Sequence, residues 1–201
     1  MEKKLISYLI TDPKYYSNDL TLFEKNLKKV LKTKKVDMAC FRDKTSKNFE
    51  ELAKIFVKIC KEFNIKKILL SEDYQLASKL KADGVHLNSK QFNDIQRAKD
   101  LNLYTIISCH NFTEIENAQK KHINAITYSP IFDTPNKGEP KGISKLREVI
   151  RSYEDLDIIA LGGIINENNI RLISKTKAFG FASIRVIFSF LIQKANFITI
   201  S

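Results

Sequence analysis

Eight short apolar runs alternate with longer amphipathic stretches along the chain, and this alternation restricts the folds open to it. The apolar runs resemble strands in length and composition, and they lie at residues 5–10, 36–41, 68–70, 84–87, 104–109, 125–128, 158–161 and 180–184. The stretches of helical period lie between them, at residues 20–31, 49–63, 75–80, 92–101, 114–121, 144–153 and 168–174. Strands that alternate with helices pair in parallel, and eight such units are the number that closes a sheet into a barrel. The sequence therefore predicts an α/β fold, a single compact TIM (β/α)8 barrel.

The length of the chain sets the scale of this barrel. Its 201 residues leave about 25 for each of eight units, fewer than in a common barrel of roughly 250 residues. We therefore expect no large insertion, and the absence of linker-like composition predicts one domain over residues 1–201. The alternative is an open, doubly wound sheet, which the lack of a GxGxxG motif after the first apolar run disfavours.

The chain is basic, with 34 Lys and Arg against 23 Asp and Glu and a net charge of +11. The excess is spread along the chain, which predicts solvated helix surfaces and no nucleic-acid partner. Cys40, Cys60 and Cys109 form no CxxC pair and are odd in number, as expected for free thiols in a reducing compartment. The run 5–10 is short for a signal-peptide core, and no segment approaches the ~18 apolar residues of a membrane span. These features predict a cytoplasmic protein with no membrane partner.

In a barrel of this kind, functional groups lie at the carboxyl ends of the strands. Gly162 and Gly163 follow the seventh apolar run, and their amides could approach an anion closely, since the loops after strands seven and eight commonly bind phosphate. The amides near Ile184 and the guanidinium of Arg185 would complete such a site after the eighth run. An ordinary glycine turn and a solvated arginine are the alternative interpretations.

The end of the second apolar run carries two cations. Period two places Cys40, Arg42 and Lys44 on one side of the chain, and two cations at the mouth of a barrel suit a phosphate or pyrophosphate group. A basic surface loop explains the same pattern.

The sixth apolar run leads into a loop at residues 129–138, which is too rich in proline, glycine and polar residues for a strand or a helix. Lys137, close to Thr134 and Asn136, could close over a polyanionic substrate as a mobile lid. A plain surface turn is the competing interpretation.

Two histidines lie at strand ends, His86 in the fourth apolar run and His110 after the fifth. Either could serve acid–base chemistry, although a histidine in such a place is more often a structural hydrogen-bonding group. Cys109 beside His110 is not a nucleophile–base pair, because adjacent residues of a strand point to opposite faces. We therefore do not expect a cysteine hydrolase.

Five segments stand in an order that is more specific than any one of them. They read ADGVHL at 82–87, SCH at 108–110, PIFDTPNK at 130–137, ALGGI at 160–164 and FASI at 181–184. Together they resemble the family of thiamine phosphate synthase and its sister protein TenI, and the resemblance covers almost the whole chain. It implies a TIM barrel, in agreement with the periodicity.

The resemblance also implies an activity and a set of binding residues. The synthase joins a pyrimidine methyl pyrophosphate to a thiazole phosphate, with Mg²⁺ helping pyrophosphate to leave, whereas TenI members bind thiazole phosphate and some are thiazole tautomerases. The residues that match the family's binding positions are Arg42 and Lys44 for pyrophosphate, Ser108, Thr134 and Lys137 for the pocket, and Gly162, Gly163 and the amides around Ile184 for thiazole phosphate.

The chain departs from the synthase pattern at the metal ligands that the resemblance implies. Residues 71–73 read Ser-Glu-Asp where the synthase has Asn-Asp-Arg, and Gln91 stands where it has an aspartate. Glu72, or Asp73 beside it, is then the remaining anionic candidate ligand. The expected cofactor is none, or Mg²⁺ if the chain acts as a synthase.

Further departures lie on the pyrimidine side, where Cys40 replaces a glutamine and Asn136 replaces a threonine. Because the phosphate cradle is retained, the resemblance favours the TenI branch, a binder of thiazole phosphate that could tautomerise it. The alternatives are a thiamine phosphate synthase, which also binds the pyrimidine pyrophosphate, and a non-enzymatic regulatory or binding protein. The apolar stretch at 188–200 could cover the barrel or form a homodimer interface.

The proton-transfer group of a tautomerase is not evident from the resemblance. The histidine that some tautomerases carry in the sixth-strand motif is Pro130 here. His110 and His86 are the remaining acid–base candidates, with Cys40 or Glu72 as alternatives.

Overall fold

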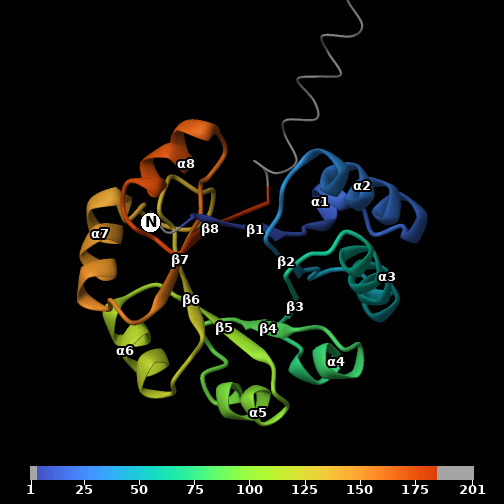
Figure 1. Cartoon of the computed structure of the whole chain (residues 1–201), viewed down its shortest axis with the longest axis horizontal. Helices are drawn as coiled ribbons and strands as arrows, with labels where there is room; N and C mark the ends of the chain where they lie inside the picture. The colour runs from blue at the N-terminus through green and yellow to red at the C-terminus, as the bar shows by residue number, and fades with distance from the viewer. Residues whose placement is uncertain (1–3, 185–201) are drawn as a thin grey trace, which may run out of the picture.

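The strands form a closed ring in the computed structural model, which describes residues 4–184. Eight parallel strands follow one another in sequence order, and β1 pairs with β8 to complete the ring (Figure 1). The strands are β1 (Ile6–Ile10), β2 (Met38–Phe41), β3 (Lys67–Ser71), β4 (Gly84–Leu87), β5 (Tyr104–Cys109), β6 (Ala125–Tyr128), β7 (Asp157–Leu161) and β8 (Gly180–Ser183). In the closing pair, Ile6 lies opposite Gly180 and Leu9 opposite Ser183. The closed ring confirms the predicted barrel and excludes the open sheet.

Helices surround the ring of strands (Figure 1). They are α1 (Pro13–Tyr16), α2 (Leu20–Thr33), α3 (Phe49–Glu62), α4 (Tyr74–Lys79), α5 (Asp94–Asp100), α6 (Phe112–Lys120), α7 (Gly142–Ser152) and α8 (Glu167–Ser174). Every predicted helix is present, with ends that shift by at most two residues.

Helix α1 was not predicted, because four residues are too few to show a period. Its start follows from local chemistry: the side chain of Asp12 accepts a hydrogen bond from Lys14 N, and Pro13 occupies the first turn.

Alternate residues of the strands point into the barrel or outward to the helices. The buried side chains that fill the interior are Tyr8, Ile10, Met38, Cys40, Leu69, Ile106, Ala125, Ile159 and Ala182. A larger apolar cluster lies between strands and helices, where the ring of Phe41 contacts the rings of Phe23, Phe49 and Phe56. Because the interior is packed, a ligand can be accommodated only at the mouth of the barrel.

The C-terminal stretch, membrane-spanning helices and the cysteines were also subjects of the sequence-based predictions. Arg185 and the stretch 188–200, the candidate barrel cover or dimer interface, lie outside the described residues. Among the helices that are described, none is long and apolar enough to span a membrane. The three cysteines are unpaired and buried.

Candidate active site

A cavity of about 530 Å³ opens at the carboxyl ends of the strands. The sequence-predicted site residues that line it are Arg42, Lys44, Glu72, His86, Ser108, His110, Thr134, Lys137, Gly162, Gly163 and Ile184. Cys40 and Asn136 are not part of this lining. The fold thus brings together candidates that are as much as 142 positions apart in the chain, from Arg42 to Ile184.

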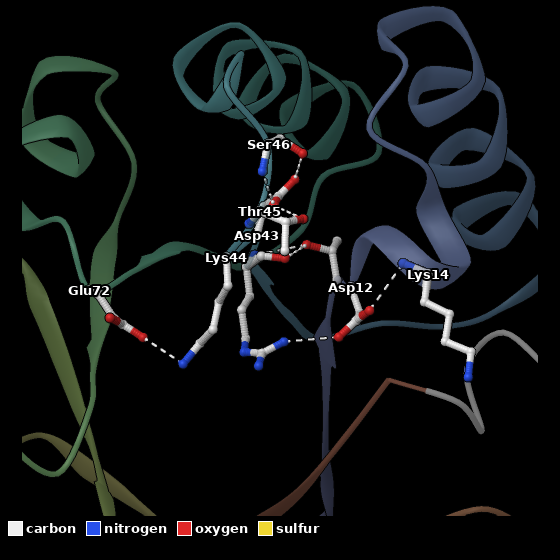
Figure 2. Close-up of polar contacts among 9 residues, drawn as sticks. Asp12, Lys14, Asp43, Lys44, Thr45, Ser46 and Glu72 are labelled. Carbon is white, nitrogen blue, oxygen red and sulfur yellow. Dashed lines mark hydrogen bonds and ion pairs between the residues drawn. The ribbon is translucent and has the colours of Figure 1, made fainter.

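Arg42 is held at the cavity by residues that follow β1. Its backbone N–H donates to Thr11 Oγ1 at 2.8 Å, and the Thr11 hydroxyl donates to the Arg42 carbonyl oxygen at 3.1 Å. Its Nη1 donates to Asp12 Oδ2 at 3.0 Å, while Asp12 Oδ1 accepts from Lys14 N at the start of α1 (Figure 2). Asp12 therefore positions both the arginine and the helix. Sequence reasoning missed this role, although the place of Asp12 just after a strand was a usable signal.

Lys44, the second cation after β2, is also paired with a carboxylate. Its Nζ lies 3.5 Å from Glu72 Oε1 of the β3–α4 loop (Figure 2). The loop that carries Lys44 is shaped by Asp43, whose carboxylate accepts hydrogen bonds from the backbone N–H groups of Thr45 and Ser46. Partial burial opposes ionisation of Asp43, but the hydrogen bond from the Ser46 hydroxyl, together with those from the N–H groups, prevails and lowers the pKa of its carboxyl group. Of the three residues that period two places on one side, Arg42 and Lys44 line the cavity and Cys40 does not.

The two glycines after β7 have left-handed backbone conformations, with φ of +95° at Gly162 and +67° at Gly163. The space around them is closed by the loop after β6. A Cβ atom on Gly162 would lie 2.7 Å from Pro130 Cα, and one on Gly163 would lie 2.5 Å from the carbonyl carbon of Phe132. Glycine is therefore required here by chain packing as well as by backbone conformation.

Backbone N–H groups beside these glycines are free to bind an anion. Those of Gly163, Ile164 and Ile184 donate to no acceptor within residues 4–184, and all three residues line the cavity. Helix α8 begins close by with Asn166 as its N-cap. Unpaired N–H groups after β7 and β8 are the donors expected of a phosphate site in this fold.

The loop that carries Lys137 is tied to β7 at its base. Ile131 N donates to the Leu161 carbonyl at 2.9 Å, and Phe132 N donates to the Gly162 carbonyl at 3.1 Å. Lys137 lines the cavity, and its ammonium group forms no hydrogen bond or ion pair with a described residue.

His86 is locked in a buried hydrogen-bond network. Its Nδ1 lies 3.1 Å from the Tyr8 hydroxyl, and its Nε2 lies 3.1 Å from Ser108 Oγ and 3.3 Å from Thr127 Oγ1. Burial, with a smaller effect of the Arg42 charge, lowers the pKa of His86 to about 4. A neutral ring with both nitrogens engaged orients Ser108 and is unsuited to proton transfer.

This shift makes stability depend on pH. In the unfolded chain a histidine titrates near pH 6.5, so between pH 6.5 and about 4 the unfolded state binds the proton and the folded state does not. We expect the free energy of unfolding to fall by about 3 kcal/mol as the pH drops through this window, as 1.36 kcal/mol per pKa unit implies. Urea denaturation at several pH values measures it.

The control is His86→Asn, which cannot titrate. Its free energy of unfolding should change less between pH 6.5 and 4 than that of the wild type. Equal pH dependence in the two proteins would show that His86 is not the group responsible.

His110 is arranged differently. Its Nδ1 lies 3.0 Å from the carbonyl oxygen of Ser129, which can only accept, so Nδ1 carries the proton. Its Nε2 has no hydrogen-bond partner in the part of the chain that the structure describes, and the residue lines the cavity. Of the two histidines proposed as acid–base groups, His110 has a ring nitrogen free to accept a proton.

Cys40, Cys109 and Lys90 differ in how they lie relative to the cavity. Cys40 is fully buried inside the barrel, and burial raises the pKa of its thiol to about 12, which disfavours it as a proton carrier. Cys109 lies in the outer apolar cluster while His110 lines the cavity, so the two do point to opposite faces. Lys90, which sequence reasoning missed, also lines the cavity, and its position three residues after β4 was the available signal.

Comparison of the chain with known proteins identifies its family. The family model described as "TMP-TENI: Thiamine monophosphate synthase" matches residues 7–187. The chain belongs to the thiamine monophosphate synthase family. Because that description covers the resemblance found in the sequence, the family prediction is confirmed, whereas the TenI branch is not distinguished.

Relatives of the thiamine monophosphate synthase family match over most of the chain. The chain is 34% identical over 182 residues to an Aquifex aeolicus protein whose name provisionally makes it a second thiamine-phosphate synthase, covering 88% of this chain and 94% of that one. It is 31% identical over 209 residues to the thiamine-phosphate synthase of Pelagibacter ubique, covering 100% of this chain and 88% of the relative. The solved thiamine phosphate pyrophosphorylase from Pyrococcus furiosus superposes with a TM-score of 0.77 at 23% identity, covering 100% of this chain and 99% of that one, and supports the fold.

For a member of the thiamine monophosphate synthase family, the resemblance implies Mg²⁺ near Glu72. The carboxylate of Glu72 is instead paired with Lys44, and Asp73 caps helix α4 by accepting from Leu76 N at 2.8 Å. Within residues 4–184, no three His, Cys, Asp or Glu side chains cluster as metal ligands.

The side chain of Gln91 is occupied as well. Its Nε2 donates to the Glu72 carbonyl oxygen at 2.9 Å and to Asp94 Oδ2 at 3.2 Å, and its Oε1 accepts from Asn88 N at 3.2 Å. This oxygen already accepts a hydrogen bond and carries no negative charge, so it is a weaker magnesium ligand than a carboxylate. Since Mg²⁺ in enzymes is usually held by one or two free carboxylates and substrate phosphates, this donor set does not fit it.

Proposed function

We propose that the protein is a thiamine-phosphate synthase, which joins a pyrimidine methyl diphosphate to a thiazole phosphate and releases diphosphate. The observation that supports this most is a single cavity with two anion-binding sides. Arg42, Lys44 and Lys90 line it after β2 and β4, and the unpaired N–H groups of Gly163 and Ile164 line it after β7. These strand ends lie on opposite sides of the ring in Figure 1. Two sides that each bind an anion suit two phosphorylated substrates.

On the cationic side, the reaction breaks the bond between the pyrimidine methyl carbon and a diphosphate oxygen. Both electrons of that bond go to the oxygen, so negative charge grows on the diphosphate while the carbon becomes cation-like. Arg42 and Lys44 line this side of the cavity and Lys137 reaches it from the loop after β6, and all three would stabilise that charge. Asp12 would keep the guanidinium of Arg42 in place during the step.

On the other side, backbone N–H groups would anchor the phosphate of the thiazole. Gly163, Ile164 and Ile184 supply these donors, and the Ser108 and Thr134 side chains line the space between the two sides. Anchoring the phosphate holds the thiazole near the cation-like carbon, and the thiazole nitrogen supplies the electron pair of the new bond.

A TenI-like thiazole tautomerase is the second candidate function, and it is the one that the sequence resemblance alone favours. The geometry of His110 supports it, because Nε2 has no hydrogen-bond partner among the described residues and the residue lines the cavity that holds the phosphate donors. We rank the synthase first, because a binder of one monophosphate does not need the cations after β2 and β4. The curated relatives that match most of the chain are also named as synthases.

A pair of product assays on the purified protein tests these functions. With both phosphorylated half-molecules and Mg²⁺ supplied, we expect thiamine phosphate and an equal amount of diphosphate, measured by chromatography. Folded protein that forms neither product would contradict the synthase proposal. Interconversion of thiazole phosphate tautomers, abolished in His110→Gln, would then support the second candidate.

A further inference from the structure

The cavity carries more cationic side chains than the resemblance to the family assigns to it. Among residues 4–184, four line it, which are Arg42, Lys44, Lys90 and Lys137, against a single lining carboxylate, Glu72. Arg42 and Lys44 are each paired with a carboxylate, at 3.0 Å to Asp12 and 3.5 Å to Glu72. Lys90 and Lys137 form no side-chain ion pair or hydrogen bond with any residue from 4 to 184. Two lysines are thus left to balance the charge of a bound anion.

Lys90 is presented by a loop of defined shape. Its backbone N–H donates to Asn88 Oδ1 at 2.8 Å, and Asn88 N donates to Gln91 Oε1 at 3.2 Å. Gln91 Nε2 then donates across to the carbonyl oxygen of Glu72 at 2.9 Å. These contacts tie the base of Lys90 to the end of β3, the same place from which Glu72 reaches Lys44.

The amide of Gln91 makes this arrangement possible. A carboxylate at position 91 has no proton to donate to the Glu72 carbonyl oxygen, so the tie between the two loops would be lost. The same amide turns its neutral oxygen to Asn88 N, where it offers a metal ion less than the carboxylate of the synthase pattern would. Gln91 therefore replaces a metal-binding carboxylate and also helps to hold the ammonium group of Lys90 at the cavity.

We propose that the cavity binds the diphosphate group without a divalent cation, and that Lys90 supplies the positive charge that a metal ion would otherwise provide. This binding mode rests on the proposed function for the identity of the diphosphate substrate. Lys90 is then a specificity-determining residue that favours a polyanion over a monophosphate.

The experiment is calorimetric titration of the purified protein with inorganic diphosphate, once in EDTA and once with Mg²⁺. We expect binding in EDTA, with an affinity that Mg²⁺ does not raise. Lys90→Gln should weaken metal-free binding by about tenfold, as the loss of one charge-assisted hydrogen bond implies. The matched control is Lys120→Gln, which removes a charge from an exposed position of α6 and should bind like the wild type.

Two outcomes would overturn the proposal: diphosphate that binds only when Mg²⁺ is present, or Lys90→Gln that binds in EDTA as tightly as the wild type. Circular dichroism checks that the variants are folded, and the exposed position of Lys90 favours this. The product assay separates this question from the proposed function. If product forms but diphosphate binds only with Mg²⁺, the metal-free binding mode is wrong and the synthase assignment stands. If diphosphate binds in EDTA but no product forms, the synthase assignment is wrong and the binding mode stands.

Discussion

Replacing Lys137 with alanine is expected to lower kcat for the coupling reaction by a factor of ~10²–10³, the cost of removing one preorganised charge-stabilising donor. The ammonium group of Lys137 lines the cavity and has no partner among the described residues, so it can face the diphosphate without first breaking an ion pair. Charge on the diphosphate grows as its bond to carbon breaks, and the lysine therefore acts more strongly on the transition state than on the substrate. Initial rates at varied substrate concentrations separate kcat from KM.

The control for this variant is Lys145→Ala on the outer surface of α7. The ammonium of Lys145 lies 2.8 Å from Glu148, and an exposed pair of this kind contributes little. Its kcat should equal that of the wild type. If Lys137→Ala instead raises KM and leaves kcat unchanged, Lys137 binds the substrate but does not stabilise the transition state.

The barrel and much of its mouth were predictable from the sequence, because both depend on short-range periodicity. Period two placed Arg42 and Lys44 on one side of the chain, and the strand-end rule placed them at the mouth. Neither period two nor the strand-end rule predicts how deep in the barrel a side chain lies. Cys40 has the same parity as Arg42, yet it lies below the cavity in the packed interior, since depth depends on the register between strands.

Contacts between loops were beyond the reach of the sequence. Asp12 pairs with Arg42 because β1 and β2 are neighbours in the ring, and Gln91 reaches Glu72 because β3 and β4 are neighbours. Each contact depends on where a loop turns after its strand, which no local pattern specifies. The position of Lys90 three residues after β4 was a usable signal, but its link to Glu72 through Gln91 is a contact of the same kind.

The sequence explains Gly162 and Gly163 as residues that let backbone N–H groups approach an anion. The structure adds that the loop after β6 leaves no room for a side chain at either position. Gly162 and Gly163 touch the loop after β6, which carries Thr134 and Lys137. The backbone N–H donor of Gly163, which would bind the thiazole phosphate, and Lys137, which would bind the diphosphate, therefore lie on two loops in direct contact. A side chain between these loops would disturb folding and binding together, so substitution of Gly163 is a poor test of binding alone.

Gly163→Ala is accordingly expected to destabilise the fold by about 2–5 kcal/mol, since a left-handed residue with a Cβ costs roughly 1–2 kcal/mol and overpacking about 1–3 more. The added Cβ would lie 2.5 Å from the carbonyl carbon of Phe132, which is backbone and cannot rotate away. Gly138→Ala is the matched control, because its φ of +71° is close to the +67° of Gly163 while nothing lies within 4 Å of its Cβ position. Only the conformational cost of about 1–2 kcal/mol should remain there. Urea unfolding midpoints of the two variants measure the difference, and equal losses of stability would show that the loop after β6 does not press on Gly163.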